Sequence, residues 1–260
     1  MNNTFDLQRF GLLLSKYTKE NARTYLLSLA VLAAILASFL TFVTYAGNGY
    51  LGPHLQATFY LVFKVLSGAM FTSIVFSAYG DKKKSIPLFT LPVSNLERYL
   101  VGWIYSFIIF QILYTACFYL VDFAVLSIAN LSSAQPNEVV NIVTIEDSKF
   151  YPGLVIFTFI HSVFFLGAIF FRNLHFIKTG FVFFGSVLGI VLINAPLLKI
   201  IFGGSAEFTP PFDSIRIIEG QGSTSLDPAP GSEMIPWILF IVMSLILWTS
   251  AYFKLKEREV

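Results

Sequence analysis

The chain has 260 residues, of which 56% are hydrophobic and 12% are charged, whereas about 25% of the residues in soluble domains are charged. This composition excludes an ordinary soluble domain and indicates an integral membrane protein. The formal charge of +2 says little by itself, because in a membrane protein the distribution of Lys and Arg matters more than their sum, and we expect no nucleic-acid partner.

Residues 4–20 predict a helix that differs from those that follow. At about 100° per residue, apolar side chains fall on one stripe and polar side chains on the opposite one. The stripes consist of Leu7, Phe10, Leu13, Leu14 and Tyr17, and of Gln8, Arg9, Ser15, Lys16 and Lys19. Because this helix carries too many charges to insert, we expect it to lie among the lipid headgroups. The alternative is a helix packed on the protein's own base.

Six segments then reach the roughly 20 apolar residues that cross a hydrocarbon core of about 30 Å. They are residues 25–46, 57–79, 99–121 (with a possible extension to Ala129), 151–171, 179–198 and 234–253. Backbone polar groups in lipid must be hydrogen-bonded within the segment, so each span is expected to be a helix. The predicted fold class is an all-α membrane protein with a single domain over residues 1–260.

Positive side chains divide unevenly between the two sets of alternating loops. With the N-terminus in the cytoplasm, only Lys149, Lys199 and Arg216 lie on the outer side, and Lys64 lies within a span. All the other Lys and Arg residues fall on the inner side. The positive-inside rule therefore predicts that both termini are cytoplasmic.

The segment 80–98 is the longest polar interruption in the first half of the chain. It carries the cations Lys82, Lys83, Lys84 and Arg98 and the apolar residues Ile86, Leu88, Phe89, Leu91 and Leu96. A merely solvated loop would not need five apolar residues. Charged ends around an apolar centre interrupted by proline indicate a short structured element that lies against another surface. We interpret it as the contact through which a membrane domain receives force from a cytoplasmic partner.

The outer segment 200–233 follows Asn194-Ala195-Pro196 near the end of the fifth span. Because proline kinks or ends a membrane helix, we expect the chain to bend there and to dip back toward the membrane surface. A plain flexible loop fits the residues equally well.

Four polar side chains are candidates for function within the spans or at their edges. Counted in residues from the outer ends of their spans, Lys64 and Asp122 lie at a similar level. Because the two spans are consecutive and antiparallel, these residues could meet as an ion pair that joins two helices. A role in substrate passage and snorkelling of each to the outer interface are the alternatives. His161, near the middle of the fourth span, is more often hydrogen-bonded to a neighbouring helix than part of a proton or substrate path, which Gln111 could also join.

Gly185 and Gly189 form a GxxxG spacing in the fifth span, which would let another helix approach closely. Equally informative is the lack of recognisable chemistry. The sequence has no GxxxxGK[ST] phosphate loop, its three histidines are too scattered for a metal site, and no catalytic constellation can be placed at one membrane level. We therefore expect no enzyme activity, metal or cofactor on this chain.

The segment Lys84–Leu100, KSIPLFTLPVSNLERYL, resembles the LPxSxxEK(F/Y)L stretch of the permease subunits of ABC-2 type exporters, especially those of Bacteroidetes. Arg98 stands where many of them have Lys. The order of elements is also similar over nearly the whole chain: an amphipathic helix, two spans, a basic connector, four spans, and a long outer segment before the last span.

The resemblance implies a mechanism in which two permease domains pair as a homodimer or heterodimer in a bacterial inner membrane. Each receives an ATP-binding subunit, which holds the ATP and Mg, at its first cytoplasmic loop. On this chain the coupling element would include Lys82, Lys83, Lys84, Leu88, Phe89, Leu91, Glu97 and Arg98. Arg172 and Lys178 would make a second contact, and segment 200–233 would be the outer gate.

Two other classes of function remain open. A non-transporting scaffold or sensor could recruit its partner through the same loop. A secondary transporter could instead move protons through Lys64, Asp122 or His161, without ATP. The sequence does not name a substrate, and its aromatic-rich spans suit a lipid, a hydrophobic peptide or a drug.

Overall fold

A computed structural model describes residues 5–80, 93–131, 136–141, 150–171, 173–202, 214–219, 222–227 and 231–257, together with Thr209 and Ala229. Its helices are α1 (Leu7–Ala46), α2 (Pro53–Gly80), α4 (Asn95–Trp103), a π-helix (Ile104–Ile109), α5 (Phe110–Ala129), α6 (Phe150–Phe170), α7 (His175–Ile201), a 3₁₀-helix (Ser232–Met234) and α8 (Ile235–Glu257). Its strands are β1 (Ile215–Glu219) and β2 (Gly222–Leu226).

Six helical stretches within the described residues are long and apolar enough to cross a membrane, which confirms the six predicted spans. The third span includes α4, the π-helix and α5 in one 35-residue rod from Asn95 to Ala129, so its possible extension is real. Most of the helices run a few residues beyond the apolar segments, because capping and polar helix formers extend them past the hydrocarbon-length core.

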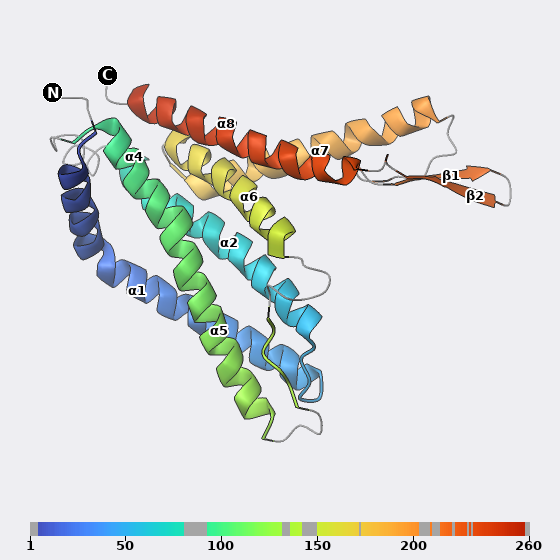
Figure 1. Ribbon diagram of the computed structural model, residues 1–260, viewed down its shortest axis with the longest axis horizontal. Helices are drawn as coiled ribbons and strands as arrows, with labels where there is room; N and C mark the ends of the chain where they lie inside the picture. The colour runs from blue at the N-terminus through green and yellow to red at the C-terminus, as the bar shows by residue number, and fades with distance from the viewer. Residues whose placement is uncertain are drawn as a thin grey trace.

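The spanning helices splay apart from the end at which both termini lie: α7 and α8 run close to the long axis of the molecule, and α4 and α5 run steeply across it (Figure 1). Helices α2 and α6 pack against each other, α1 packs along α5, and α7 and α8 flank α6. The first turns of α1 and the last turn of α8 lie at the same end, which we call the base (Figure 1). The opposite end, from which the β-hairpin projects, is called the far end.

Two apolar clusters hold the helices together. The larger one joins α1, α2, α5 and α6 through residues such as Leu40, Tyr60, Phe118 and Phe157. The smaller one lies toward the base and joins α2, α4, α6 and α8. Both are rich in aromatic rings in edge-to-face or stacked pairs, which add to the energy of simple burial.

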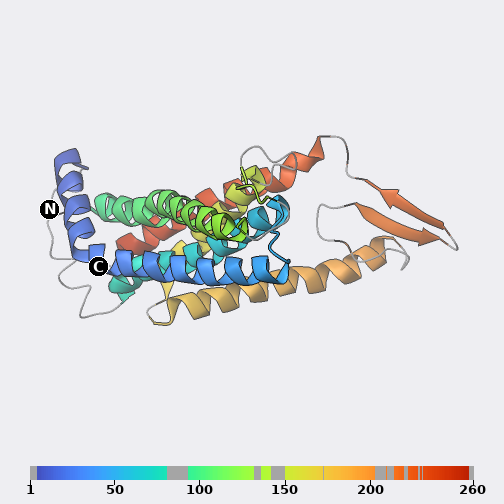
Figure 2. The ribbon, with the colours of Figure 1, turned by 90° about the horizontal axis from the view of Figure 1, so that it is seen from below.

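The N-terminal helix and the first span are one continuous helix, α1, rather than the two helices expected from residues 4–20 and 25–46. Figures 1 and 2 show that its first part runs across the base and that the rest turns to follow the bundle. Thr18 and Asn21 donate hydrogen bonds to the carbonyls of Leu14 and Tyr17, four residues earlier. Such bonds back to the preceding turn bend helices without breaking them.

The outer segment differs from the prediction in two ways. Helix α7 continues through Pro196 to Ile201, so the proline does not end it; membrane helices tolerate proline where other groups satisfy the freed carbonyl. Strands β1 and β2 then pair as an antiparallel hairpin, with Ile217 opposite Thr224. The hairpin extends the molecule away from the bundle instead of dipping back over it (Figure 2).

Candidate functional site

The start of α4 at the base is fixed by a capping box. The backbone N–H of Glu97 donates to Ser94 Oγ at 3.3 Å, and the backbone N–H of Ser94 donates to Glu97 Oε2 at 2.9 Å. Each side chain therefore satisfies a donor that the first turn of a helix leaves without a partner. Ser94 and Glu97 both belong to the LPxSxxE stretch, so this part of the motif has a structural role within the chain.

Glu97 also ties the start of α1 to the start of α4. Its Oε1 accepts a hydrogen bond from the backbone N–H of Asp6 at 2.9 Å and one from Arg9 Nη2 at 3.2 Å. Asp6 caps α1 in turn, and hydrogen bonds from the backbone N–H groups of Arg9 and Gln8 lower the pKa of its carboxyl group. The base thus contains a buried carboxylate with donors from two segments about 90 residues apart in the sequence.

The predicted coupling residues are only partly placed. Lys82, Lys83, Lys84, Leu88, Phe89, Leu91 and Arg172 lie outside the described residues. Glu97 and Arg98 are 0% and 4% exposed, so they are not the surface charges that were expected. Lys178 is exposed in the first turn of α7, with its Nζ 5.9 Å from the ring centre of Phe171, and it remains available to a partner.

Aromatic residues support the crossing of α1 over the base. Tyr17 packs against Tyr105 at a ring-centre distance of 4.9 Å, and its hydroxyl donates to the carbonyl of Val75 at 3.2 Å. Thr18 Oγ1 is hydrogen-bonded to the hydroxyl of Tyr105. These contacts correspond to the alternative of a helix packed on the protein's own base. Leu7 and Leu12 are exposed, so contact of the same helix with headgroups stays a prediction.

Lys64 and Asp122 are both buried, but they do not form the expected ion pair. The Lys64 ammonium lies 5.2 Å from the ring centres of both Tyr60 and Phe157. Neither oxygen of the Asp122 carboxyl group has a hydrogen-bond partner among the described residues.

The helix ends explain why the ion pair fails. Helix α2 begins at Pro53 and α5 continues to Ala129, beyond the ends from which the two levels were counted. The rings of Tyr60 and Phe118 touch, with centres 5.1 Å apart. From that level Lys64 lies one turn toward the base and Asp122 one turn toward the far end, which separates them by about 12 Å along the axis at 1.5 Å per residue.

His161 is hydrogen-bonded to two neighbouring helices, as its position predicts. Trp248 Nε1 on α8 donates to His161 Nδ1 at 3.2 Å, so the ring proton is on Nε2, which donates to Ser106 Oγ in the π-helix at 2.9 Å. Ser106 donates in turn to the carbonyl of Gly102 at 2.8 Å. Every polar atom of the ring has a partner, which fits a structural role. The described residues contain no group of His, Cys, Asp and Glu suited to a metal ion.

The predicted packing glycines meet no other helix among the described residues of this chain. A Cβ at Gly185 or Gly189 would have no atom within 4 Å among the described residues. Close approach occurs at glycines outside any GxxxG spacing. An added Cβ would collide at Gly68 with Phe157, at Gly153 with Leu61, and at Gly167 with Thr179. At these three positions the lack of a side chain on glycine allows a neighbouring side chain to approach the helix backbone closely.

The structure shows a polar contact at the far end that the sequence does not predict. Residues 136–141, here called the strap, lie over the loop between α1 and α2. Asn137 Oδ1 accepts from the backbone N–H of Leu51 at 2.8 Å, and Asn137 Nδ2 donates to the carbonyl of Gly49 at 2.8 Å. Gln56 accepts from the N–H of Val140 at 2.9 Å and donates to the carbonyls of Leu51 and Glu138. Both side chains are buried, and nothing in the local sequence marks either of them.

Replacing Gln56 with leucine is expected to loosen the strap. The change leaves the Val140 N–H and two carbonyls without their partner, at a cost of about 1 kcal/mol or more for each lost hydrogen bond. Hydrogen exchange in detergent should then become at least about tenfold faster at the Val140 amide, since each 1.4 kcal/mol changes an opening equilibrium tenfold. The control is Thr58→Val, which removes an exposed hydroxyl two residues after Gln56 on the same helix. Equal exchange in both variants would show that Gln56 does not hold the strap.

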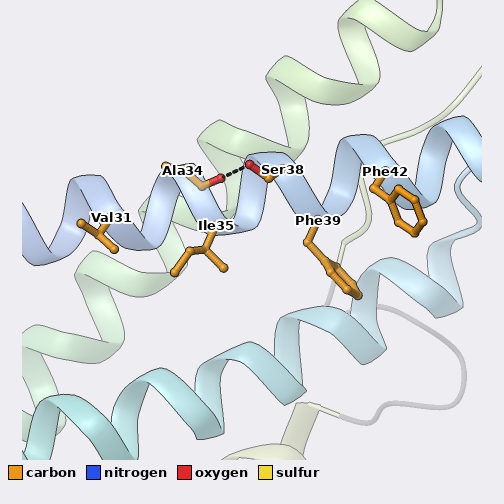
Figure 3. A pocket seen from close by; sticks show the side chains of 6 residues that line it. All are labelled: Val31, Ala34, Ile35, Ser38, Phe39 and Phe42. Atoms are coloured by element: carbon orange, nitrogen blue, oxygen red, sulfur yellow. Dashed lines mark hydrogen bonds between the residues drawn. The ribbon is translucent and has the colours of Figure 1, made fainter.

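A shallow apolar hollow of about 530 Å³ lies on the surface of α1 (Figure 3). Its lining consists of Val31, Ala34, Ile35, Ser38, Phe39 and Phe42. The Ser38 hydroxyl donates to the carbonyl of Ala34 at 2.8 Å and is thereby satisfied within the helix. Because all six residues come from one helix, this hollow is a surface that suits a lipid chain rather than an enclosed site for a polar ligand.

Comparison with known proteins gives no relative for this chain: no family model, no curated protein and no solved structure matches it.

Proposed function

We propose that this chain is the membrane-spanning permease subunit of an ATP-driven exporter in a bacterial inner membrane. The observation that carries the proposal is segment 80–98 between two spans, where charged ends flank an apolar centre in a stretch that resembles the ABC-2 permeases. The six spanning helices and the position of the start of α4 at the base support it. In this proposal the base faces the cytoplasm, as the distribution of Lys and Arg favours.

The capping box and the Glu97–Arg9 ion pair give the segment a firm support. A displacement of residues 80–98 by the partner would move α4 directly. The continuous helical stretch from Asn95 to Ala129 would transmit this displacement across the membrane. The same displacement would reach α1 through Glu97. ATP and Mg belong to a partner subunit, and a second permease copy or a homologous permease completes the transporter.

The test is purification of the tagged chain in mild detergent, from cells that express it with its candidate ATP-binding subunits. We expect a partner that carries a GxxxxGK[ST] sequence and hydrolyses ATP. Leu88→Asp places a charge in the apolar centre of the segment and should reduce the co-purified partner at least about tenfold, the effect of losing about 1.4 kcal/mol of binding.

The matched control is Leu12→Asp, which introduces the same change at an exposed leucine of α1 and should leave the amount of partner unchanged. A partner that binds without hydrolysing ATP would favour the scaffold or sensor. Failure to recover any ATP-binding partner with the unchanged chain in several detergents would overturn the exporter.

A further inference from the structure

Lys64 is a cation inside the bundle that has no acidic partner among the described residues. It is 2% exposed, and the ion pairs among the described residues do not include it. Two aromatic ring faces, of Tyr60 and Phe157, lie 5.2 Å from its ammonium. Such rings attract a cation but do not neutralise it. A buried charge in a membrane segment usually faces a partner or a cavity and marks a functional site.

Lys64 belongs to a buried polar column on one face of α2. Gln56, Tyr60 and Lys64 follow one another at intervals of four residues, and all three are buried. Side chains on a helix lean toward its N-terminus, which for α2 is the far end. The position of the ammonium beside Tyr60, one turn earlier, agrees with this direction. The column therefore leads from Lys64 toward the far end.

The strap contacts this column at the far end. Gln56, its first residue, accepts the N–H of Val140 and donates to the carbonyl of Glu138. The Tyr60 hydroxyl is hydrogen-bonded to Thr115 Oγ1 at 2.9 Å and is also satisfied. The Lys64 ammonium is thus the group of the column that still lacks a strong acceptor in the described part of the chain.

We infer that Lys64 binds the anionic head group of an amphipathic molecule, and that the strap covers this site at the far end. The inference rests on the proposed transport function, for which it names the chemical class of the substrate: a phosphate or carboxylate joined to an apolar chain. Lysine binds such groups as a point charge. The rings of Tyr60 and Phe157 lie beside the ammonium and are the apolar surface nearest to the bound head group.

Binding is tested with the purified chain in a neutral maltoside detergent, without ATP or any partner, using dodecyl phosphate as the probe. We expect saturable uptake by equilibrium dialysis. Lys64→Met, which keeps an unbranched apolar side chain, should weaken the affinity at least tenfold, and Lys64→Arg should retain most of it. Lys256→Gln, which removes an exposed lysine in the last turn of α8 at the base, serves as the control and should bind like the unchanged chain.

Two further probes separate the contributions of head group and chain. Dodecyltrimethylammonium has the chain with a cationic head, and inorganic phosphate has the head without a chain; both should bind at least tenfold more weakly than dodecyl phosphate. Equal uptake of the cationic probe, or equal affinity of Lys64→Met, would overturn the inference. Inorganic phosphate binding as tightly as dodecyl phosphate would overturn the amphipathic substrate.

A measurement on the unchanged chain keeps the test independent of whether Lys64→Met folds. Dodecyl phosphate should slow acetylation of Lys64 by acetic anhydride at least fivefold, measured by mass spectrometry of its peptide, and should leave Lys256 unaffected. Equal protection of both lysines would count against a site. Because these assays contain no ATP-binding subunit, a failure here leaves the exporter standing, and a failure of the co-purification leaves this site standing.

Discussion

Glu97→Ala is expected to destabilise the base by about 2–4 kcal/mol. The Glu97 side chain is 0% exposed and accepts hydrogen bonds from the backbone N–H groups of Ser94 and Asp6 and from Arg9. Alanine leaves those donors without their acceptor, which costs about 1–3 kcal/mol for each buried group. The contribution of Arg9 is smaller because its side chain is 32% exposed and its charge is screened.

The measurement is thermal unfolding in detergent, combined with hydrogen exchange of the first turns of α1. Glu20→Ala is the matched control, because Glu20 pairs with Lys16 on the exposed surface of the same helix and such pairs contribute at most about 0.5 kcal/mol. Glu97→Gln keeps one acceptor oxygen and should fall between the two. Similar unfolding of the Glu97→Ala and Glu20→Ala variants would contradict the role of Glu97.

Gly167→Ala is expected to cost about 3 kcal/mol and to separate α6 from α7. A Cβ at Gly167 would overlap the Thr179 side chain, including Thr179 Cγ2 at 2.6 Å and Thr179 Cβ at 2.8 Å. A Cβ is fixed to its backbone, so a rotamer change cannot relieve that contact and one helix must move. Added atoms in a packed contact typically cost about 1–3 kcal/mol, and more where the neighbours cannot yield.

The control for this change is Gly185→Ala, which meets no atom within 4 Å in the described part of the chain. It should leave the melting temperature unchanged or raise it, because alanine favours a helix over glycine by up to about 1 kcal/mol. Thr179→Ala combined with Gly167→Ala should recover part of the loss. A large loss in Gly185→Ala would instead place another helix, from a second copy, against that face.

The spans could be predicted because hydrocarbon thickness imposes their length whatever their neighbours are. The contacts between them could not. Counting from the apolar ends of the spans places Lys64 and Asp122 at one level. A helix continues until its backbone is capped, so the apolar ends do not mark the helix ends, and the two residues lie at different levels. Glu97 belongs to a Ser-x-x-Glu pattern before an apolar run, which predicts a capping box, although its place beside a charged segment equally favours contact with a partner.

Other features depend on tertiary contact alone. Gln56 holds residues more than 80 positions away, and nothing in the local sequence marks it. The GxxxG spacing at Gly185 and Gly189 is conspicuous but has no neighbour among the described residues, whereas the isolated Gly167 packs against Thr179. The hairpin was missed because each strand has only five residues, too few for alternation to stand out among prolines.

Helix α7 makes the molecule sensitive to the thickness of its bilayer. Its 27 residues span about 40 Å, whereas a typical hydrocarbon core is about 30 Å thick. Thr179, in its second turn, is its one fully buried residue among those described, so tight packing constrains the helix near its start. Tilt resolves such a mismatch at modest cost. A thinner membrane should therefore increase the tilt of α7. The larger tilt should change the distance of the hairpin from the membrane surface.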